Sequence, residues 1–151
     1  MNLLHNNTLG IDIGSTTVKI AVLDSEQHIL FTDYERHYAN IQETLALLLS
    51  RAKEKLGEMT VSPSITGSGG LTLSGHLNVP FTQEVVAVAT ALQDYAPQTD
   101  VAIELGGEDA KIIYFTGGID QRMNGICAGG TGSFIDQMAS LLQTDAAGLN
   151  E

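Results

Sequence analysis

The chain has 151 residues, 43% hydrophobic and 17% charged, a composition typical of a globular protein with a substantial core. Its net charge of −11, with only seven Lys and Arg residues, excludes nucleic-acid binding through a basic patch. One cysteine excludes an internal disulfide framework, and without a signal peptide or an apolar run of about 20 residues we expect a cytoplasmic protein with no membrane partner.

The first part of the chain alternates strand and helix patterns. Short β-rich runs that end at turn residues predict strands over residues 8–14, 17–23, 29–37 and 64–66. Apolar residues at helical spacing predict a helix over 41–56, with Asn40 as its N-cap and Glu43 completing the cap. A glycine-rich turn is expected over 67–70, and a second helix over 83–95.

The same order of elements restarts in the second part of the chain. Strands are expected over 101–105, 111–115 and 119–123, followed by a helix over 133–142. We therefore expect a first domain over residues 1–97 and a second domain over 98–151 that is truncated soon after its first helix. The sequence then reads as a fragment of a longer α/β protein, in which one domain is followed by the start of a duplicated second domain.

A duplicated segment relates the two parts. Residues 11–24 and 103–116 share an acid, a glycine and a lysine at one constant offset, inside strand-like runs. The corresponding residues are Asp12 and Glu104, Gly14 and Gly106, and Lys19 and Lys111. The repeat predicts two related hairpins, each with a polar glycine turn. Two such turns that face each other can hold a phosphate chain from both sides.

The first turn carries groups suited to Mg²⁺ and phosphate. Asp12 can hold the water shell of a Mg²⁺ ion, while Gly14, Ser15 and Thr16 supply close backbone approach, amides and hydroxyls. Lys19 can neutralise a terminal phosphate. A hairpin turn with an exposed lysine is the simpler interpretation of one copy alone, but the second copy favours a phosphate site.

The second turn repeats this chemistry with more acids. Glu104 or Asp109 can position an attacking or metal-bound water, while Gly106 and Gly107 hold phosphates and Lys111 supplies positive charge. Taken alone, a diglycine hairpin with solvated acids explains this segment better. The phosphate interpretation therefore depends on the two turns acting together.

Other polar residues give no additional site. The four histidines, which show no metal-ligand spacing and are interpreted as surface or turn residues, are His5, His28, His37 and His76. No Ser-His-Asp or Cys-His arrangement can be argued from these positions. The metal-ligand candidate from the residues alone is Asp12.

Four motifs carry a resemblance to a known family. They run from Asp12 to Lys19 (Asp-Ile-Gly-Ser-Thr-Thr-Val-Lys), from Thr66 to Gly69, from Glu104 to Lys111, and from Met123 to Gly132 (Met-Asn-Gly-Ile-Cys-Ala-Gly-Gly-Thr-Gly). They resemble the activators of 2-hydroxyacyl-CoA dehydratases and the ATPase subunits of benzoyl-CoA reductase, a family of CoA-substrate-specific enzyme activases. This family belongs to the superfamily of actin, sugar kinases and heat-shock ATPases. The resemblance therefore implies a ribonuclease H-like (actin-like ATPase) fold.

The resemblance also implies an ATP-dependent activator that couples ATP hydrolysis to low-potential electron transfer. In such a protein ATP or ADP binds with Mg²⁺, and Cys127 would ligate a [4Fe–4S] cluster shared across a homodimer or an intramolecular pair. The implied partner is the dehydratase or reductase component that acts on a CoA ester. The chain departs from the family pattern at Glu104, where the family has Asp, and at Glu108, where it has Gln. We expect ATPase activity from the full-length protein, and neither activity nor a cluster from this fragment alone.

Two other functions fit the sequence. One is a small-molecule kinase of the same superfamily, which needs an acceptor site and a catalytic base that nothing in the sequence marks. The other is a non-catalytic, ATPase-like module used for docking or dimerisation. Nucleotide binding separates the activator and the kinase from the docking module.

Overall fold

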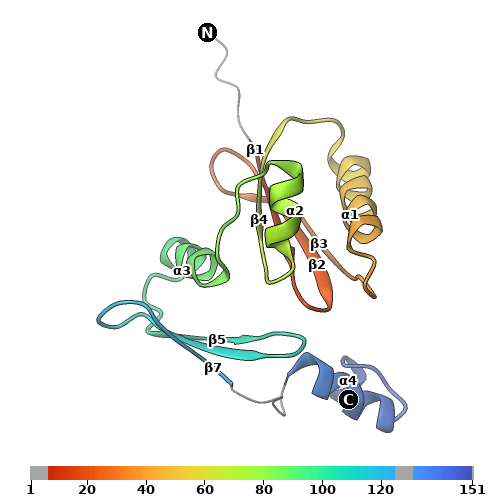
Figure 1. The fold of residues 1–151 in the computed structure, drawn as a ribbon, viewed down its shortest axis with the longest axis vertical. Coiled ribbons are helices and arrows are strands. Elements are labelled where there is room, and N and C mark those ends of the chain that lie inside the picture. Colours follow the sequence, from red (N-terminus) through yellow and green to blue (C-terminus); the bar gives the residue numbers. More distant parts are fainter. Residues whose placement is uncertain (1–6, 125–130, 151) are drawn as a thin grey trace. The chain divides into compact units, whose positions relative to one another are not determined.

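The computed structural model describes residues 7–124 and 131–150, which form two compact units that divide between Ala87 and Val88 (Figure 1). The division falls inside helix α3 (Glu84–Tyr95), so this helix contributes residues to both units. Cys127 lies outside the described residues.

The first unit is a mixed sheet with helices after its third and fourth strands (Figure 1). Its strands are β1 (Asn7–Ile13), β2 (Thr17–Leu23), β3 (Ile29–Arg36) and β4 (Val61–Thr66). They lie in the order β3-β2-β1-β4, in which β4 is parallel to β1 and the other neighbours are antiparallel. Helix α1 (Ile41–Leu56) connects β3 to β4, and α2 (Gly70–Leu77) follows β4.

The core of this unit lies between one face of the sheet and α1. The buried residues alternate along β1 and β2 and recur at helical spacing on α1: Leu9, Ile11, Ile13, Val18, Ile20, Val22, Leu45, Leu48 and Ala52. Ile65 of β4 completes this cluster. Because the burial follows the sequence periodicity, β2 and α1 have the predicted bounds.

The largest differences from the sequence prediction in the first unit are in β4 and α2. Strand β4 begins at Val61 rather than at residue 64, and Pro63 lies inside it. A proline is tolerated there because β4 is the last strand in the sheet order, where one side of the backbone needs no ladder donor. Helix α2 begins at Gly70, where the sequence predicts only a turn. Its short length and the glycines at 70 and 75 hide its periodicity.

The start of α1 also differs in one detail. Asn40 precedes the helix, as predicted, and its carbonyl accepts the Thr44 N–H at 3.1 Å. The Asn40 side chain makes no capping bond to the backbone. Its amide donates to Glu43 Oε2 at 2.5 Å instead, so the two side chains contact each other rather than completing a capping box.

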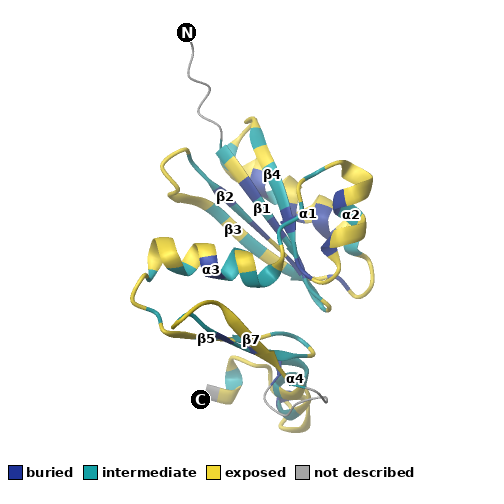
Figure 2. Ribbon diagram, turned by 60° about the vertical axis from the view of Figure 1, so that its left-hand side comes forward, coloured by how far each residue is buried: buried dark blue, intermediate teal, exposed yellow. Residues whose placement is uncertain are grey.

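The second unit repeats the strand–strand–strand–helix order of the first. The antiparallel strands β5 (Val101–Leu105), β6 (Ala110–Tyr114) and β7 (Asp120–Met123) are followed by α4 (Gly132–Leu141) and a 3-10 turn, η1 (Gly148–Asn150). Among its described residues, the buried apolar side chains are Ala89, Ile113 and Ala139, and the whole of β7 is exposed (Figure 2). Across both described stretches, every helix is too short or too polar to cross a membrane.

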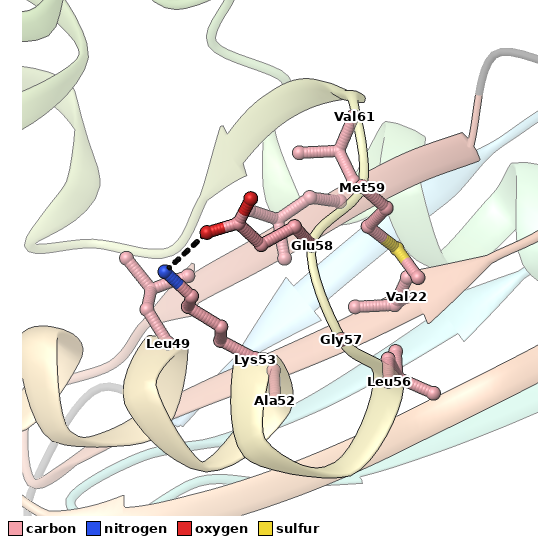
Figure 3. Close-up of a pocket in the computed structure, with 10 residues that line it drawn as sticks. Val22, Leu49, Ala52, Lys53, Leu56, Gly57, Glu58, Met59 and Val61 are labelled. Atoms are coloured by element: carbon pink, nitrogen blue, oxygen red, sulfur yellow. Dashed lines mark ion pairs between the residues drawn. The ribbon is translucent and has the colours of Figure 1, made fainter.

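A pocket lies between α1 and the sheet of the first unit (Figure 3). Its volume is about 390 Å³, and its lining residues are Leu9, Val22, Leu49, Ala52, Lys53, Leu56, Gly57, Glu58, Met59 and Val61. Lys53 Nζ and Glu58 Oε1 form an ion pair of 3.0 Å beside it. Leu9 pairs with Val22 at the end of the β1–β2 hairpin that is remote from its turn. The pocket is therefore separate from the predicted phosphate site.

The turn after β4 packs against the end of β1. The Gly69 N–H donates to Ile13 O at 2.9 Å. Gly67 has a φ of +96°, and a Cβ at this position would collide with Ile13 O and lie 2.6 Å from Asp12 Oδ1. Both the backbone conformation and the close approach therefore require glycine at position 67.

Leu48 and Leu47 provide a test of the core. Leu48 is fully buried, whereas its neighbour Leu47 on the same helix is 44% exposed. Leu48→Ala should lower the free energy of unfolding by about 2–5 kcal/mol, because it removes apolar contacts and leaves a cavity. Leu47→Ala should cost less than about 1 kcal/mol. Urea unfolding followed by circular dichroism measures both, and equal losses would contradict the assigned core face of α1.

The contact at Gly67 provides a second test. Gly57 also has a positive φ, of +79°, but a Cβ there meets nothing within 4 Å. Gly57→Ala should therefore cost about 1–3 kcal/mol, from backbone strain alone. Gly67→Ala should cost more than about 3 kcal/mol, because the new methyl group also collides with β1. A thermal-unfolding midpoint for Gly67→Ala equal to that of Gly57→Ala would show that this packing is absent.

Candidate functional site

The first turn connects β1 to β2 and places an acid beside a lysine. The Gly14 N–H donates to Thr17 O at 2.9 Å, which closes the turn. The antiparallel register pairs Asp12 with Lys19, on the sheet face opposite the α1-covered core. Lys19 Nζ lies 2.8 Å from Asp12 Oδ2, with side chains 53% and 34% exposed. The turn thus presents a carboxylate, an ammonium and backbone groups together.

His37 lies against this turn, so its interpretation as a surface or turn residue is wrong in respect of exposure. It is 8% exposed, and its Nε2 lies 3.2 Å from Gly14 O. It follows β3, which pairs with β2, and this pairing brings it to the turn between β1 and β2. A single histidine after a strand carries no periodic signal, so the sequence alone gives no means of placing it.

The end of β4 brings a hydroxyl group next to Asp12. Thr66 pairs with Asp12 in the parallel register of β1 and β4. Among the described residues, the buried side-chain oxygens without a hydrogen-bond partner are Thr66 Oγ1 and Glu104 Oε2. Buried polar atoms are almost always hydrogen-bonded, so exceptions point to an ordered water, an ion or a ligand group. One of these oxygens lies beside the acid of the first turn, and the other belongs to the acid of the second.

The second turn connects β5 to β6 and has the same construction as the first. The Gly106 N–H donates to Asp109 O at 2.8 Å, and the register pairs Glu104 with Lys111. Lys111 Nζ lies 3.2 Å from Glu104 Oε1 and 4.0 Å from Asp109 Oδ2. The sequence repeat therefore corresponds to a structural repeat that includes the ion pair across the strands.

The two ion pairs differ in burial. The Lys111 side chain is 8% exposed, against 53% for Lys19. A buried ammonium needs its acidic partner, because removing one member of such a pair leaves an uncompensated charge. An exposed pair is worth less than about 1 kcal/mol and can exchange its partner at small cost. The ion pair of the second turn is therefore the more costly of the two to separate.

Helix α4 is attached to the second turn. The Gly132 N–H donates to Gly106 O, and the Ser133 N–H to Gly107 O, each at 2.9 Å. Ser133 Oγ also donates to Gly107 O, at 2.5 Å. A Cβ at Gly132 would lie 3.3 Å from Gly106 O, so glycine permits this close approach. These bonds connect the start of α4, which follows Cys127 in the sequence, to the diglycine turn.

The predicted site residues thus gather as two groups, one in each unit. The first unit brings together Asp12, Gly14, Ser15, Thr16 and Lys19. The second unit brings together Glu104, Gly106, Gly107, Asp109 and Lys111. The clamp formed by both turns, and the roles of these residues, remain predictions. Sequence reasoning missed His37 and the hydroxyl of Thr66.

The sequence predicts Mg²⁺ at Asp12 and, in the full-length protein only, a cluster at Cys127, which lies outside the described residues. Within residues 7–124 and 131–150, no three His, Cys, Asp or Glu side chains converge to form a metal site. Mg²⁺ is usually held through one or two carboxylates, its own waters and the phosphates of a substrate. Asp12 beside the unpartnered Thr66 Oγ1 suits that mode of binding.

Comparison with known proteins supports the fold. The (R)-2-hydroxyglutaryl-CoA dehydratase activating ATPase of Acidaminococcus fermentans is 30% identical over 149 residues, which cover 95% of this chain and 56% of that protein. The structure of the activator of the 2-hydroxyisocaproyl-CoA dehydratase from Clostridium difficile with bound ADPNP has a TM-score of 0.76 at 27% identity, covering 95% of this chain and 55% of that one. The chain therefore spans about half the length of the relatives it matches.

A more distant structure shows the fold alone. The ROK family glucokinase from Streptomyces griseus has a TM-score of 0.58 at 17% identity, covering 91% of this chain and 62% of that one. Together these similarities confirm the predicted α/β, actin-like ATPase fold. The four motifs, from Asp12 to Gly132, lie within residues 9–150, the part of the chain that matches one family model. The chain belongs to the BadF/BadG/BcrA/BcrD ATPase family.

Proposed function

We propose that the full-length protein is an ATP-dependent activator of a CoA-ester dehydratase or reductase. The observation that carries this proposal is the repeated turn, in which an acid faces a lysine beside a glycine turn in each unit. Relatives are named as activators of such dehydratases, and one of them has ADPNP bound. ATP or ADP is therefore the ligand proposed for the two turns.

The first turn would hold Mg²⁺ and phosphate oxygens. Bound Mg²⁺ supplies positive charge against the phosphates while it keeps most of its waters. Asp12 would bind this water shell, and Thr66 Oγ1 would gain a hydrogen-bond partner there. Lys19 would move from Asp12 to a terminal phosphate, which its exposed side chain permits at small cost. Ser15 and Thr16 would contribute backbone and hydroxyl donors.

The second turn would order the attacking water. Lys111 is buried and paired, so it would hold Glu104 in place rather than move to the phosphate. Glu104 or Asp109 would accept a hydrogen bond from the water, as a positioning group does in phosphoryl transfer. Because the Gly106 N–H is already bonded to Asp109 O, phosphate contact in this turn would fall mainly to Gly107.

Electron transfer is the finer part of this proposal. Cys127 would ligate a [4Fe–4S] cluster that needs further ligands from a second subunit or segment. Gly132 and Ser133 follow Cys127 in sequence and bond directly to Gly106 and Gly107. A change in phosphate contact at the second turn would therefore reach the start of α4 through two backbone hydrogen bonds. The partner would be the dehydratase or reductase component.

Asp12→Asn should weaken Mg-ATP binding by about tenfold or more, because it removes the charge that holds the metal's waters. Its exposed ion pair contributes little to folding, so the thermal midpoint should stay near that of the unmodified protein. Isothermal titration calorimetry of the full-length protein measures the dissociation constant. Asp94→Asn, an exposed acid on α3, is the matched control and should bind as the unmodified protein does.

The products that the unmodified full-length protein forms from ATP distinguish the activator from a kinase. An ATP-dependent activator releases phosphate to water, whereas a kinase transfers it to a small acceptor. Acceptor-dependent ADP formation without hydrolysis would contradict the activator function. An unmodified protein that gives no binding heat at millimolar Mg-ATP would favour the docking module.

Anaerobic reconstitution with iron and sulfide tests the cluster. We expect the full-length protein to develop a broad visible absorption that Cys127→Ala abolishes, since a thiolate ligand is lost. Cys127→Ala should retain Mg-ATP binding, because Cys127 is not placed among the phosphate contacts. An absorption that survives this change would remove Cys127 from the ligands while leaving the ATPase proposal intact.

A further inference from the structure

His37 forms hydrogen bonds to the first turn. It is buried directly after β3, whereas Ser15 at the tip of the turn is exposed. His37 Nε2 lies 3.2 Å from Gly14 O, and the His37 backbone N–H donates to Thr16 O at 3.1 Å. One residue therefore contacts the carbonyl groups on both sides of Ser15.

The partners of the His37 ring define its tautomer. Nδ1 lies 3.0 Å from the nitrogen of Ala39, a backbone N–H that can only donate. Nδ1 must therefore accept, which places the ring proton on Nε2. Nε2 then donates to the Gly14 carbonyl, a group that can only accept. Both ring nitrogens of a neutral histidine are satisfied by this arrangement.

The bond to the Gly14 carbonyl sets the direction of the next amide. In a planar trans peptide the C=O and the following N–H point in opposite directions. Because the Gly14 C=O points toward His37, the Ser15 N–H points away from it. This amide belongs to the residue that is exposed at the tip of the turn, where phosphate is proposed to bind.

The backbone after His37 has an uncommon conformation. Tyr38 and Ala39 have φ angles of 42° and 67°, in the left-handed region that residues with a Cβ rarely adopt. The Ala39 N–H donates to the His37 ring, and the Asn40 N–H donates to His37 O at 2.5 Å. Hydrogen bonds to His37 therefore help to hold a strained segment beside the turn. Strained backbone that is held in this way is common at binding and active sites, where it fixes the geometry before the ligand binds.

We propose that His37 is a positioning residue for nucleotide binding, which acts by fixing the Gly14–Ser15 peptide so that the Ser15 N–H faces phosphate. This inference rests on the proposed function of the first turn. Its Nε2–H is the required group, because it alone of the His37 ring atoms contacts Gly14. The Nδ1 contact to Ala39 maintains the loop and is a separate role.

Two variants separate these roles. In His37→Gln the side-chain amide can place an N–H donor near the position of Nε2 but has no group near Nδ1. In His37→Asn an oxygen can replace Nδ1 as acceptor, but the side chain is too short to reach Gly14. Each variant loses one of the two ring contacts, so thermal midpoints report the structural cost of each. His28→Asn is the control, since His28 is exposed in the β2–β3 turn at the other end of the hairpin.

Mg-ATP titration of the full-length protein measures the effect. We expect His37→Gln and His28→Asn to bind within about twofold of the unmodified protein, and His37→Asn to bind about three- to tenfold more weakly, the range of one neutral hydrogen bond. The loss of affinity should occur in the variant that lacks the donor to Gly14, whichever of the two variants has the lower thermal midpoint. Equal affinities for the Gln and Asn variants overturn this inference while the proposed function stands. Failure of the unmodified protein to bind Mg-ATP overturns both.

Discussion

The antiparallel register that places a carboxylate opposite a lysine is the constraint on which both turns depend. In β1 and β2 it requires that Asp12 and Lys19 lie directly opposite each other. Side chains alternate between sheet faces, so a slip of one residue would move Asp12 into the core that α1 covers. Core packing and site geometry are therefore set by the same register, and Gly14 closes the turn that maintains it.

The repeat gives the two turns the same geometry with different electrostatic roles. Around the first turn the pair is exposed, and a buried histidine and the turn after β4 support the backbone. Around the second, Lys111 is buried and α4 bonds to the diglycine carbonyls. The first turn thus has an exposed lysine, while the second has a buried lysine and a glycine backbone that is bonded to α4. Of the two lysines, Lys19 can therefore exchange its acidic partner at the smaller cost.

Much of this arrangement is predictable from the sequence, and the remainder has identifiable causes. Strong periodicity located β2 and α1, and the offset between Asp12 and Glu104 predicted the repeated hairpin. The start of β4 was not predicted because it contains Pro63. A proline is tolerated in a strand only at certain places in the sheet, and the sequence does not show that β4 is the last strand in the order. The position of His37 follows from strand pairing, which a local pattern does not encode. Burial of Lys111 but not of Lys19 arises from tertiary packing around otherwise matching residues.

The difference in lysine burial has a chemical consequence. An ammonium group must reach solvent and lose its proton before it can be acylated or reductively methylated. Lys19 satisfies the first condition, with half of its side chain exposed, whereas Lys111 is enclosed beside two carboxylates. Amine-directed reagents and acetyl-transferring enzymes would therefore distinguish two lysines that occupy equivalent places in the sequence repeat. Acylation would then remove the positive charge of Lys19 while leaving Lys111 unmodified.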